Sequence, residues 1–216
     1  MTFSMDPADY LRYLADAHRE LSANGDYITS LDAKNGDGDH WVNLNLGFQK
    51  ILAASEELGT LSLPAMLKKT GMIMMSAVGG SSGVLYGSAY LAAAKATEGK
   101  EFIDGRALLA ILEAQAKAIG ERGQAEPGFK TMLDSLHGAV VAYREALGKG
   151  DGDKEALLAL KAGAAAGAEA TRGMEAVKGR ASYQTNKGVG DLDPGAVTMA
   201  MQLGCLADYL IANCLK

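Results

Sequence analysis

Three aspartates lie close together early in the chain, in the run Leu31-Asp-Ala-Lys-Asn-Gly-Asp-Gly-Asp-His40. Carboxylate oxygens are the ligands that Mg²⁺ prefers, and a protein-bound Mg²⁺ often shares them with a phosphate. The glycines let the backbone turn sharply enough for Asp32, Asp37 and Asp39 to converge. An EF-hand is excluded, because a loop starting at Asp37 would put Val42 where the sixth-position glycine is required. The run predicts a metal site, although taken alone it is also typical of a turn with solvated acids.

Two later segments combine glycines with hydroxyl or cationic side chains. Gly79-Gly-Ser-Ser-Gly83 precedes a predicted helix, where successive backbone N–H groups bind anions. Residues 123–131 end in Gly-Phe-Lys-Thr and so miss the P-loop pattern, which needs Gly-Lys-Thr after a strand. Lys130 and Thr131 remain compatible with phosphate at another helix start.

The last long connection carries Lys178-Gly-Arg-Ala-Ser-Tyr183 and Asp191-Leu-Asp-Pro-Gly195. Connections of this length in a helical bundle are usually functional or disordered. Arg180 either clamps a phosphate through two hydrogen bonds or pairs with a nearby acid, and the sequence does not separate these roles.

The elements that must position these segments are helices, because apolar residues recur at helical spacing and no run alternates with period two. Eight helices are expected over residues 7–21, 42–58, 63–75, 84–97, 104–119, 132–147, 154–176 and 194–214. Alternate connections of an up-and-down bundle fall at the same end. The four segments above occupy every second connection, so the sequence predicts an all-α antiparallel bundle with its site at one end.

The composition narrows the setting. The 216 residues contain no linker-like stretch, which favours a single domain over 1–216. A net charge of −5 without a Lys/Arg cluster argues against nucleic acid as a partner. The uncharged stretch 71–94 is interrupted by glycines, which predicts two buried helices and no membrane span. No signal peptide is expected. Cys205 and Cys214 would lie roughly 13 Å apart on one helix, too far to bridge, which fits a reduced, cytoplasmic setting.

The histidines offer no nucleophilic triad. His18, His40 and His137 lie in unrelated contexts, and His18 and His137 are expected on helix faces in core or surface roles. His40 would contact a phosphate or cap the next helix.

The motifs together, in their order and spacing, resemble the nucleotide-binding L subunit of phosphotransferase-system-dependent dihydroxyacetone kinase. The resemblance covers nearly the whole chain. It is carried by Leu31-Asp32, Gly36-Asp-Gly-Asp-His40, Asn43, Thr70-Gly71, Val78-Gly-Gly-Ser-Ser-Gly83, Arg122-Gly123, Ala125-Glu-Pro-Gly128, Lys130-Thr-Met132, Lys178-Gly-Arg-Ala-Ser-Tyr183 and Asp193-Pro-Gly-Ala196.

The resemblance implies an eight-helix barrel that holds ADP and two Mg²⁺ at one end. Asp32, Asp37 and Asp39 would hold the metals. The residues lining the nucleotide would be His40, Trp41, Val42, Asn43, Ser81, Ser82, Gly123, Met132, Arg180, Asp193, Pro194 and Gly195. In such systems ADP acts as a prosthetic group that a phosphohistidine-carrying M subunit recharges to ATP. The γ-phosphoryl then passes to dihydroxyacetone held by a separate K subunit, so no catalytic base is expected in this chain.

Two departures from the family pattern keep other interpretations open. Trp41 and Val42 follow His40 where the family commonly has a small residue first, and Leu46 stands where a basic residue often precedes Gly47. Another phosphoryl donor, or another triose or tetrose substrate, fits these changes. One alternative is the nucleotide domain of an ATP-dependent ketose kinase whose ATP exchanges freely. Another is a nucleotide-dependent regulatory subunit. A homodimer stays open.

Overall fold

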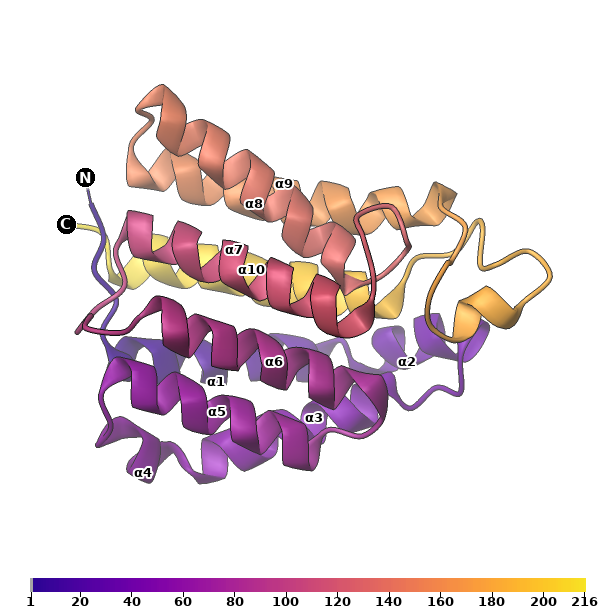
Figure 1. Ribbon diagram of the computed structural model, residues 1–216, viewed down its shortest axis with the longest axis horizontal. Coiled ribbons are helices and arrows are strands. Elements are labelled where there is room, and N and C mark those ends of the chain that lie inside the picture. Colours follow the sequence, from indigo (N-terminus) through magenta and orange to yellow (C-terminus); the bar gives the residue numbers. More distant parts are fainter. Residues whose placement is uncertain (1) are drawn as a thin grey trace.

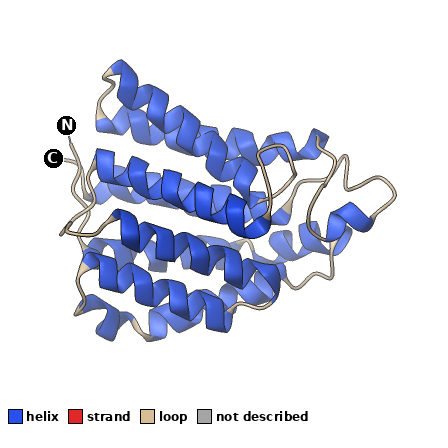
Figure 2. Cartoon of the chain, viewed as in Figure 1, coloured by secondary structure: helices blue, strands red, loops and turns tan. Residues whose placement is uncertain are grey.

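The computed structural model describes residues 2–216, and its regular secondary structure is helical throughout, without a β-strand in that range (Figures 1 and 2). The α-helices are α1 (Pro7–Ala23), α2 (Gly25–Asn35), α3 (His40–Ala53), α4 (Ser55–Gly59), α5 (Leu63–Ala77), α6 (Gly80–Ala96), α7 (Gly105–Gly123), α8 (Met132–Lys149), α9 (Asp153–Ala170) and α10 (Pro194–Asn213). Two 3₁₀ turns, η1 (Thr171–Gly173) and η2 (Arg180–Tyr183), lie between α9 and α10. The all-α prediction is confirmed.

The helices form a closed ring. Going around it, α1 packs on α3, α3 on α5, α5 on α6, α6 on α7, and α7 on α8; α9 lies against α8 and α10, and α10 returns to α1. The apolar faces turn inward, as the helical spacing predicts. A cavity of about 50 Å³ remains inside, bounded in part by Tyr10, Tyr13, Tyr86 and Tyr90. The Gln202 side chain donates a hydrogen bond of 2.8 Å to the Tyr86 hydroxyl there.

The helix boundaries differ from the predicted ones at several places. Residues 25–35, for which the sequence predicts no helix, form α2; buried Ile28 and Leu31 are three residues apart and anchor it. The run 42–58 breaks at Ala54 into α3 and α4. The predicted helix over 154–176 ends at Ala170, where the chain passes into η1.

Small residues bring α8 and α9 close together. A side-chain carbon on Gly138 or Gly163 would collide with the backbone carbonyl of the other, and one on Gly167 would collide with the Asp134 carbonyl. The alanine- and glycine-rich composition of α9 therefore serves close helix approach, as its sequence suggests.

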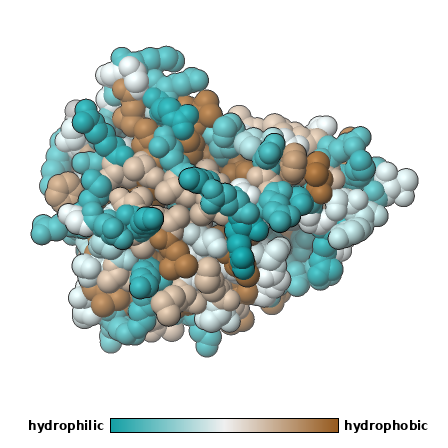
Figure 3. All heavy atoms as spheres, in the orientation of Figure 1, coloured by the Kyte–Doolittle hydropathy of each residue, from teal (hydrophilic) through white to brown (hydrophobic). Residues whose placement is uncertain are grey.

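The connections divide the barrel into two ends (Figure 1). The site end carries α2 and the connections 36–39, 78–79, 124–131 and 171–193. The closed end carries both chain termini and the connections 97–104 and 150–152. The chemistry-bearing segments thus lie together at one end. On the face shown in Figure 3, the projecting site end carries mostly hydrophilic or neutral residues.

The last helix, Pro194–Asn213, is long and apolar enough to cross a membrane by length and composition alone. However, 67% of the apolar 18-residue stretch of this helix is buried inside the bundle, as expected of a core helix. The uncharged stretch 71–94 folds as parts of α5 and α6, joined by a short connection at Val78 and Gly79.

Candidate functional site

The three aspartates meet at the site end. Asp32 belongs to the last turn of α2, whereas Asp37 and Asp39 lie in the loop that follows it, and one carboxylate oxygen of each lies within 4.8 Å of the others. Asp32 is 8% exposed, and its carboxylate accepts a 3.0 Å hydrogen bond from the His40 backbone N–H. A Cβ on Gly36 would lie 2.5 Å from an Asp32 carboxylate oxygen, so a larger residue there would displace that carboxylate. This donor set suits a hard divalent cation.

Arg180 joins the acidic cluster from the other side. Its guanidinium lies 2.5 Å from the Asp37 carboxylate. The segment that carries it is also fastened to α2, because the Gln184 amide donates a 2.7 Å hydrogen bond to the Lys34 carbonyl. The second of the two roles left open for Arg180, an ion pair with a nearby acid, is the one the structure displays, and the acid is one of the three clustered aspartates.

His40 faces the interior. Its Nε2 lies 2.9 Å from the Thr198 hydroxyl in the first turns of α10. Burial lowers the pKa of His40, with Asp32 and Asp39 opposing that effect. The imidazole therefore ties the start of α3 to α10, and the backbone N–H of His40 holds the Asp32 carboxylate.

Four helices, α3, α6, α8 and α10, begin at the site end (Figure 1). Helix N-termini carry partial positive charge and backbone N–H groups without helical partners, both of which favour anions. Within residues 2–216, the N-cap residues of α3 and α6, Asp39 and Gly79, make no side-chain hydrogen bond to their helices. Ser81 and Ser82 lie in the first turn of α6, a helix that begins at Gly80, earlier than predicted. The end that gathers carboxylates thus also favours phosphate.

The starts of α8 and α10 lie side by side. A Cβ on Gly195 would stand 3.5 Å from the Met132 Cβ. Pro194 is the first residue of α10, and the Asp193 carboxylate caps that helix by accepting a 2.7 Å hydrogen bond from the Ala196 N–H. Asp193 is half-buried, and burial raises its pKa to about 7.

The remaining predicted residues are less central. The Trp41 indole packs against Gly25 at the start of α2, and Val42 is 62% exposed. The Asn43 amide packs against Gly79 and so joins α3 to the start of α6. Gly123 ends α7. Among these residues, Asn43 contacts another predicted segment.

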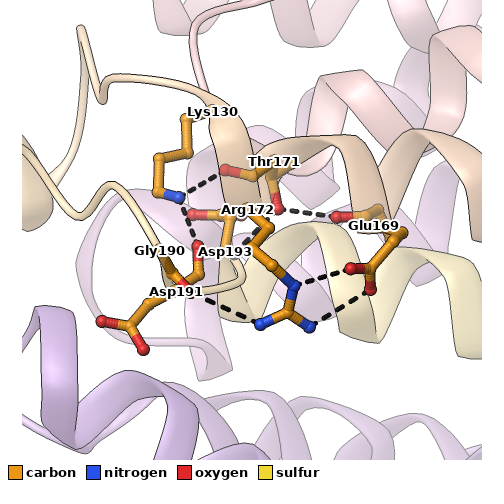
Figure 4. Close-up of polar contacts among 8 residues, drawn as sticks. Lys130, Glu169, Thr171, Arg172, Gly190, Asp191 and Asp193 are labelled. Carbon is orange, nitrogen blue, oxygen red and sulfur yellow. Dashed lines mark hydrogen bonds and ion pairs between the residues drawn. The ribbon is translucent and has the colours of Figure 1, made fainter.

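Some contributors could not be picked out from the sequence. Thr171 lies in the predicted helix 154–176, yet it is buried and its hydroxyl accepts a 3.0 Å hydrogen bond from the Asp193 N–H. Lys130, a phosphate candidate by its motif, instead donates to backbone carbonyls, as Figure 4 shows. His18 and His137 have the structural roles expected: His18 stacks on Phe48, and His137 is exposed.

Comparison with known proteins supplies the family. The DAK2 domain matches residues 34–208. The chain belongs to the DAK2 domain family. It is 33% identical over 204 residues to the ADP-binding subunit DhaL of the PEP-dependent dihydroxyacetone kinase of Escherichia coli K12, covering 94% of this chain and 97% of that one. It is 36% identical over 201 residues to the ADP-binding subunit DhaL of the PEP-dependent dihydroxyacetone kinase 1 of Listeria innocua, covering 93% and 94% of the two chains. The predicted kinase-subunit family is thereby confirmed.

Two solved structures have the same fold. The native dihydroxyacetone kinase of C. freundii superposes with a TM-score of 0.72 at 25% identity, covering 94% of this chain and 35% of that chain. The same enzyme in complex with AMP-PNP and Mg²⁺ gives a TM-score of 0.66 at 26% identity, covering 92% and 33%. This chain therefore spans about a third of that kinase.

Proposed function

We propose that this DAK2 chain, as a single domain over residues 1–216, is the ADP/ATP–Mg²⁺-carrying subunit of a dihydroxyacetone kinase. One observation carries the proposal: three carboxylates meet at the end of the barrel where four helix N-termini also converge. Carboxylates alone would repel a nucleotide, and helix N-termini alone would not hold a cation. Together they match a metal–diphosphate unit, which presents a cation to the acids and oxygen atoms to the N–H groups. The names of the full-length relatives support the same assignment.

The residues divide the work by charge. Asp32, Asp37 and Asp39 would hold two Mg²⁺. The first turns of α3, α6, α8 and α10 would face the phosphates and the nucleoside, through His40–Asn43, Ser81–Ser82, Met132 and Asp193–Gly195, with Gly123 nearby. Arg180 would exchange its bond to Asp37 for a phosphate oxygen once a metal satisfies that carboxylate, because a guanidinium binds phosphate in the same forked geometry.

The reaction needs little chemistry from the chain itself. Phosphoryl transfer depends mainly on positioning and on neutralising charge, and bound Mg²⁺ supplies that neutralisation. We infer that a phosphohistidine carrier (M) subunit recharges the bound ADP and that the γ-phosphoryl passes to dihydroxyacetone on a partner K subunit. The side chains of this site orient and hold the nucleotide, and the catalytic base belongs to the partner subunit. A cytoplasmic setting, without nucleic acid or membrane as a partner, accompanies this proposal.

The first test is mass spectrometry of the small molecules released when freshly purified, undialysed protein is denatured. The proposal expects about one ADP or ATP per chain, retained with Mg²⁺ and lost on chelation with EDTA. A chain that holds no nucleotide under any of these conditions, and binds none on addition, overturns it.

A second candidate uses the same site with a nucleotide that exchanges freely. It is favoured by the match to longer enzymes, since the chain is 34% identical to human triokinase/FMN cyclase but spans 32% of that protein. Exchange of labelled ATP into the ADP-loaded chain separates the two. Exchange over hours supports the prosthetic nucleotide, and exchange within seconds supports the ATP-dependent kinase domain.

A further inference from the structure

Lys130 is a lysine almost wholly withdrawn from water. It is 2% exposed and ranks among the largest fully buried side chains. Its ammonium donates hydrogen bonds of 2.5 Å to two backbone carbonyls, those of Thr171 and Asp191 (Figure 4). Burial lowers its pKa, while Asp193 and Asp191 oppose that effect. A buried ammonium is costly unless it is hydrogen-bonded, and the two carbonyls supply those hydrogen bonds.

The two carbonyls lie at the neck of the long connection 171–193, where its first residues, 171–172, approach its last residues, 190–193. Thr171 begins the connection just after α9, and Asp191 lies two residues before the cap of α10. Other bonds cross the same neck: the Gly190 N–H donates to the Arg172 carbonyl at 2.8 Å, and the Asp193 N–H donates to the Thr171 hydroxyl. Lys130 belongs to neither of the two segments that form the neck. It reaches in from the segment before α8 and holds both sides at once.

The backbone at Lys130 is also unusual. Its φ of +62° lies in the left-handed region, which residues other than glycine seldom adopt. Neighbouring bonds fix this conformation, because the Val177 N–H donates to the Phe129 carbonyl at 3.2 Å and the Thr131 N–H donates to the Asp134 carboxylate at 2.7 Å. Strain of this kind persists where the surroundings impose it, and it is frequent at functional sites. Here it turns the lysine inward to the neck.

We propose that Lys130 is a positioning residue that closes the neck of the 171–193 connection and thereby holds Arg180 over the acidic cluster. The connection between the two ends of the neck carries η2 and Arg180, whose guanidinium reaches Asp37. A released neck would let Arg180 leave the cluster. The inference rests on the proposed function for its consequence, the retention of nucleotide, but the closure itself is a property of the chain without any ligand.

The first experiment therefore uses metal-free, nucleotide-free protein. Hydrogen–deuterium exchange is measured across residues 174–190 in wild type, Lys130→Met and Lys187→Met. Lys187 is the matched control, because it lies in the same connection but makes an exposed ion pair with Glu175 at 2.9 Å. Exchange in this connection should accelerate in Lys130→Met and stay near wild type in the control. Equal protection in wild type and Lys130→Met overturns the closure, whatever the chain binds.

The second experiment asks whether the effect runs through Arg180. Dissociation of Mg²⁺–ADP is timed in Lys130→Met, Arg180→Ala and the double variant. Lys130→Met should release ADP roughly tenfold faster or more, the scale of lost supporting shells around metal sites. Once Arg180 is absent, the lysine substitution should add little, because residues acting through one another are non-additive. Fully multiplicative effects would show that Lys130 acts independently of Arg180 and overturn the positioning role.

Lys130→Arg keeps the argument testable if the methionine variant folds poorly. It retains a cation with several donors for the two carbonyls, so it should restore at least part of the slow exchange in 174–190 and of the slow ADP release. Lys130→Gln, which has no cation at this position, is the comparison. If a folded Lys130→Arg protein exchanged across 174–190 as fast as Lys130→Gln, the proposal would be wrong. If wild type itself binds no ADP, the proposed function fails while the exchange result still decides the closure.

Discussion

The two ends of this barrel differ in how their polar groups find partners. At the closed end, backbone pairs join the termini to the body: the Met5 and Ile103 backbones exchange hydrogen bonds of 2.9 and 2.8 Å, and the Lys216 N–H donates to the Thr2 carbonyl at 2.9 Å. Phe3, Met5 and Ile103 are buried there. At the site end, one of the clustered carboxylates pairs with an arginine, and α3, α6, α8 and α10 begin (Figure 1). One end is satisfied by its own chain, and the other concentrates charged side chains and helix N-termini.

This difference implies a division between stability and function. Charges of one sign placed close together, as Asp32, Asp37 and Asp39 are, repel one another and bury little apolar surface. Apolar side chains at the closed end contribute burial and do not face the site. Substitutions at the site end should therefore change binding at little cost in stability, and substitutions at the closed end should do the reverse.

The largest expected effect is on metal-dependent nucleotide binding in Asp37→Asn. Loss of one carboxylate ligand should weaken Mg²⁺–ADP binding by more than about 100-fold, since even supporting residues around a metal typically account for 10- to 100-fold. The melting temperature without ligand should stay the same or rise slightly. Isothermal titration calorimetry and a thermal melt measure the two quantities.

The control for this variant is Asp26→Asn, which removes an exposed carboxylate from the first turn of α2 without touching the cluster. Its affinity for Mg²⁺–ADP should match wild type. If both variants lost affinity equally, the general negative charge of this end, and not the cluster, would be responsible.

The sequence predicts the parts of this site that depend on local pattern. Helical spacing locates the bundle, and the alternation of bland and chemistry-bearing connections places the four segments at one end. The convergence of Asp32, Asp37 and Asp39 follows from the glycines between them. Placing Asp32 on a helix does not follow, because α2 depends on the burial of Ile28 and Leu31 by distant segments.

Long-range contacts account for what the sequence hides. His40 and Thr198 are 158 residues apart, and Lys130 reaches carbonyls 41 and 61 residues away. In a motif, Lys130 next to Thr131 suggests phosphate. Its direction is set by a left-handed backbone and by the neck it fills, neither of which has a local signature.

The next largest effect is expected at the closed end. Met5→Ala should lower the free energy of unfolding by about 2–5 kcal/mol, the usual cost of truncating a buried methionine, because Met5 is 1% exposed in the core. Urea unfolding measures this change. The affinity of the folded protein for Mg²⁺–ADP should not change.

Met72→Ala is the matched control, because Met72 is an exposed methionine on α5 and its loss should change stability by no more than about 0.5 kcal/mol. A Met5→Ala protein that stayed as stable as this control, yet lost ADP affinity, would contradict the division between the two ends.

The smallest effect compares two helix caps, one at each end. Asp104 at the closed end and Asp193 at the site end both accept a 2.7 Å hydrogen bond from a helix N–H. Burial raises the folded-state pKa of Asp193 from its ordinary value of 3.8 to about 7. Its contribution to stability is therefore complete below about pH 4 and is lost as the pH rises toward 7, when the buried group must ionise.

The substitution Asp193→Asn separates the cap from the charge, because an asparagine side chain cannot ionise and still caps a helix. Unfolding in urea with EDTA should show this variant gaining stability relative to wild type as the pH rises from about 5 to about 8. Partial exposure of Asp193 and the retained cap keep this gain below the loss in Met5→Ala. Asp104→Asn is measured in parallel, and the same pH dependence in both variants would attribute the effect to any charged cap and not to the burial that sets the site end apart.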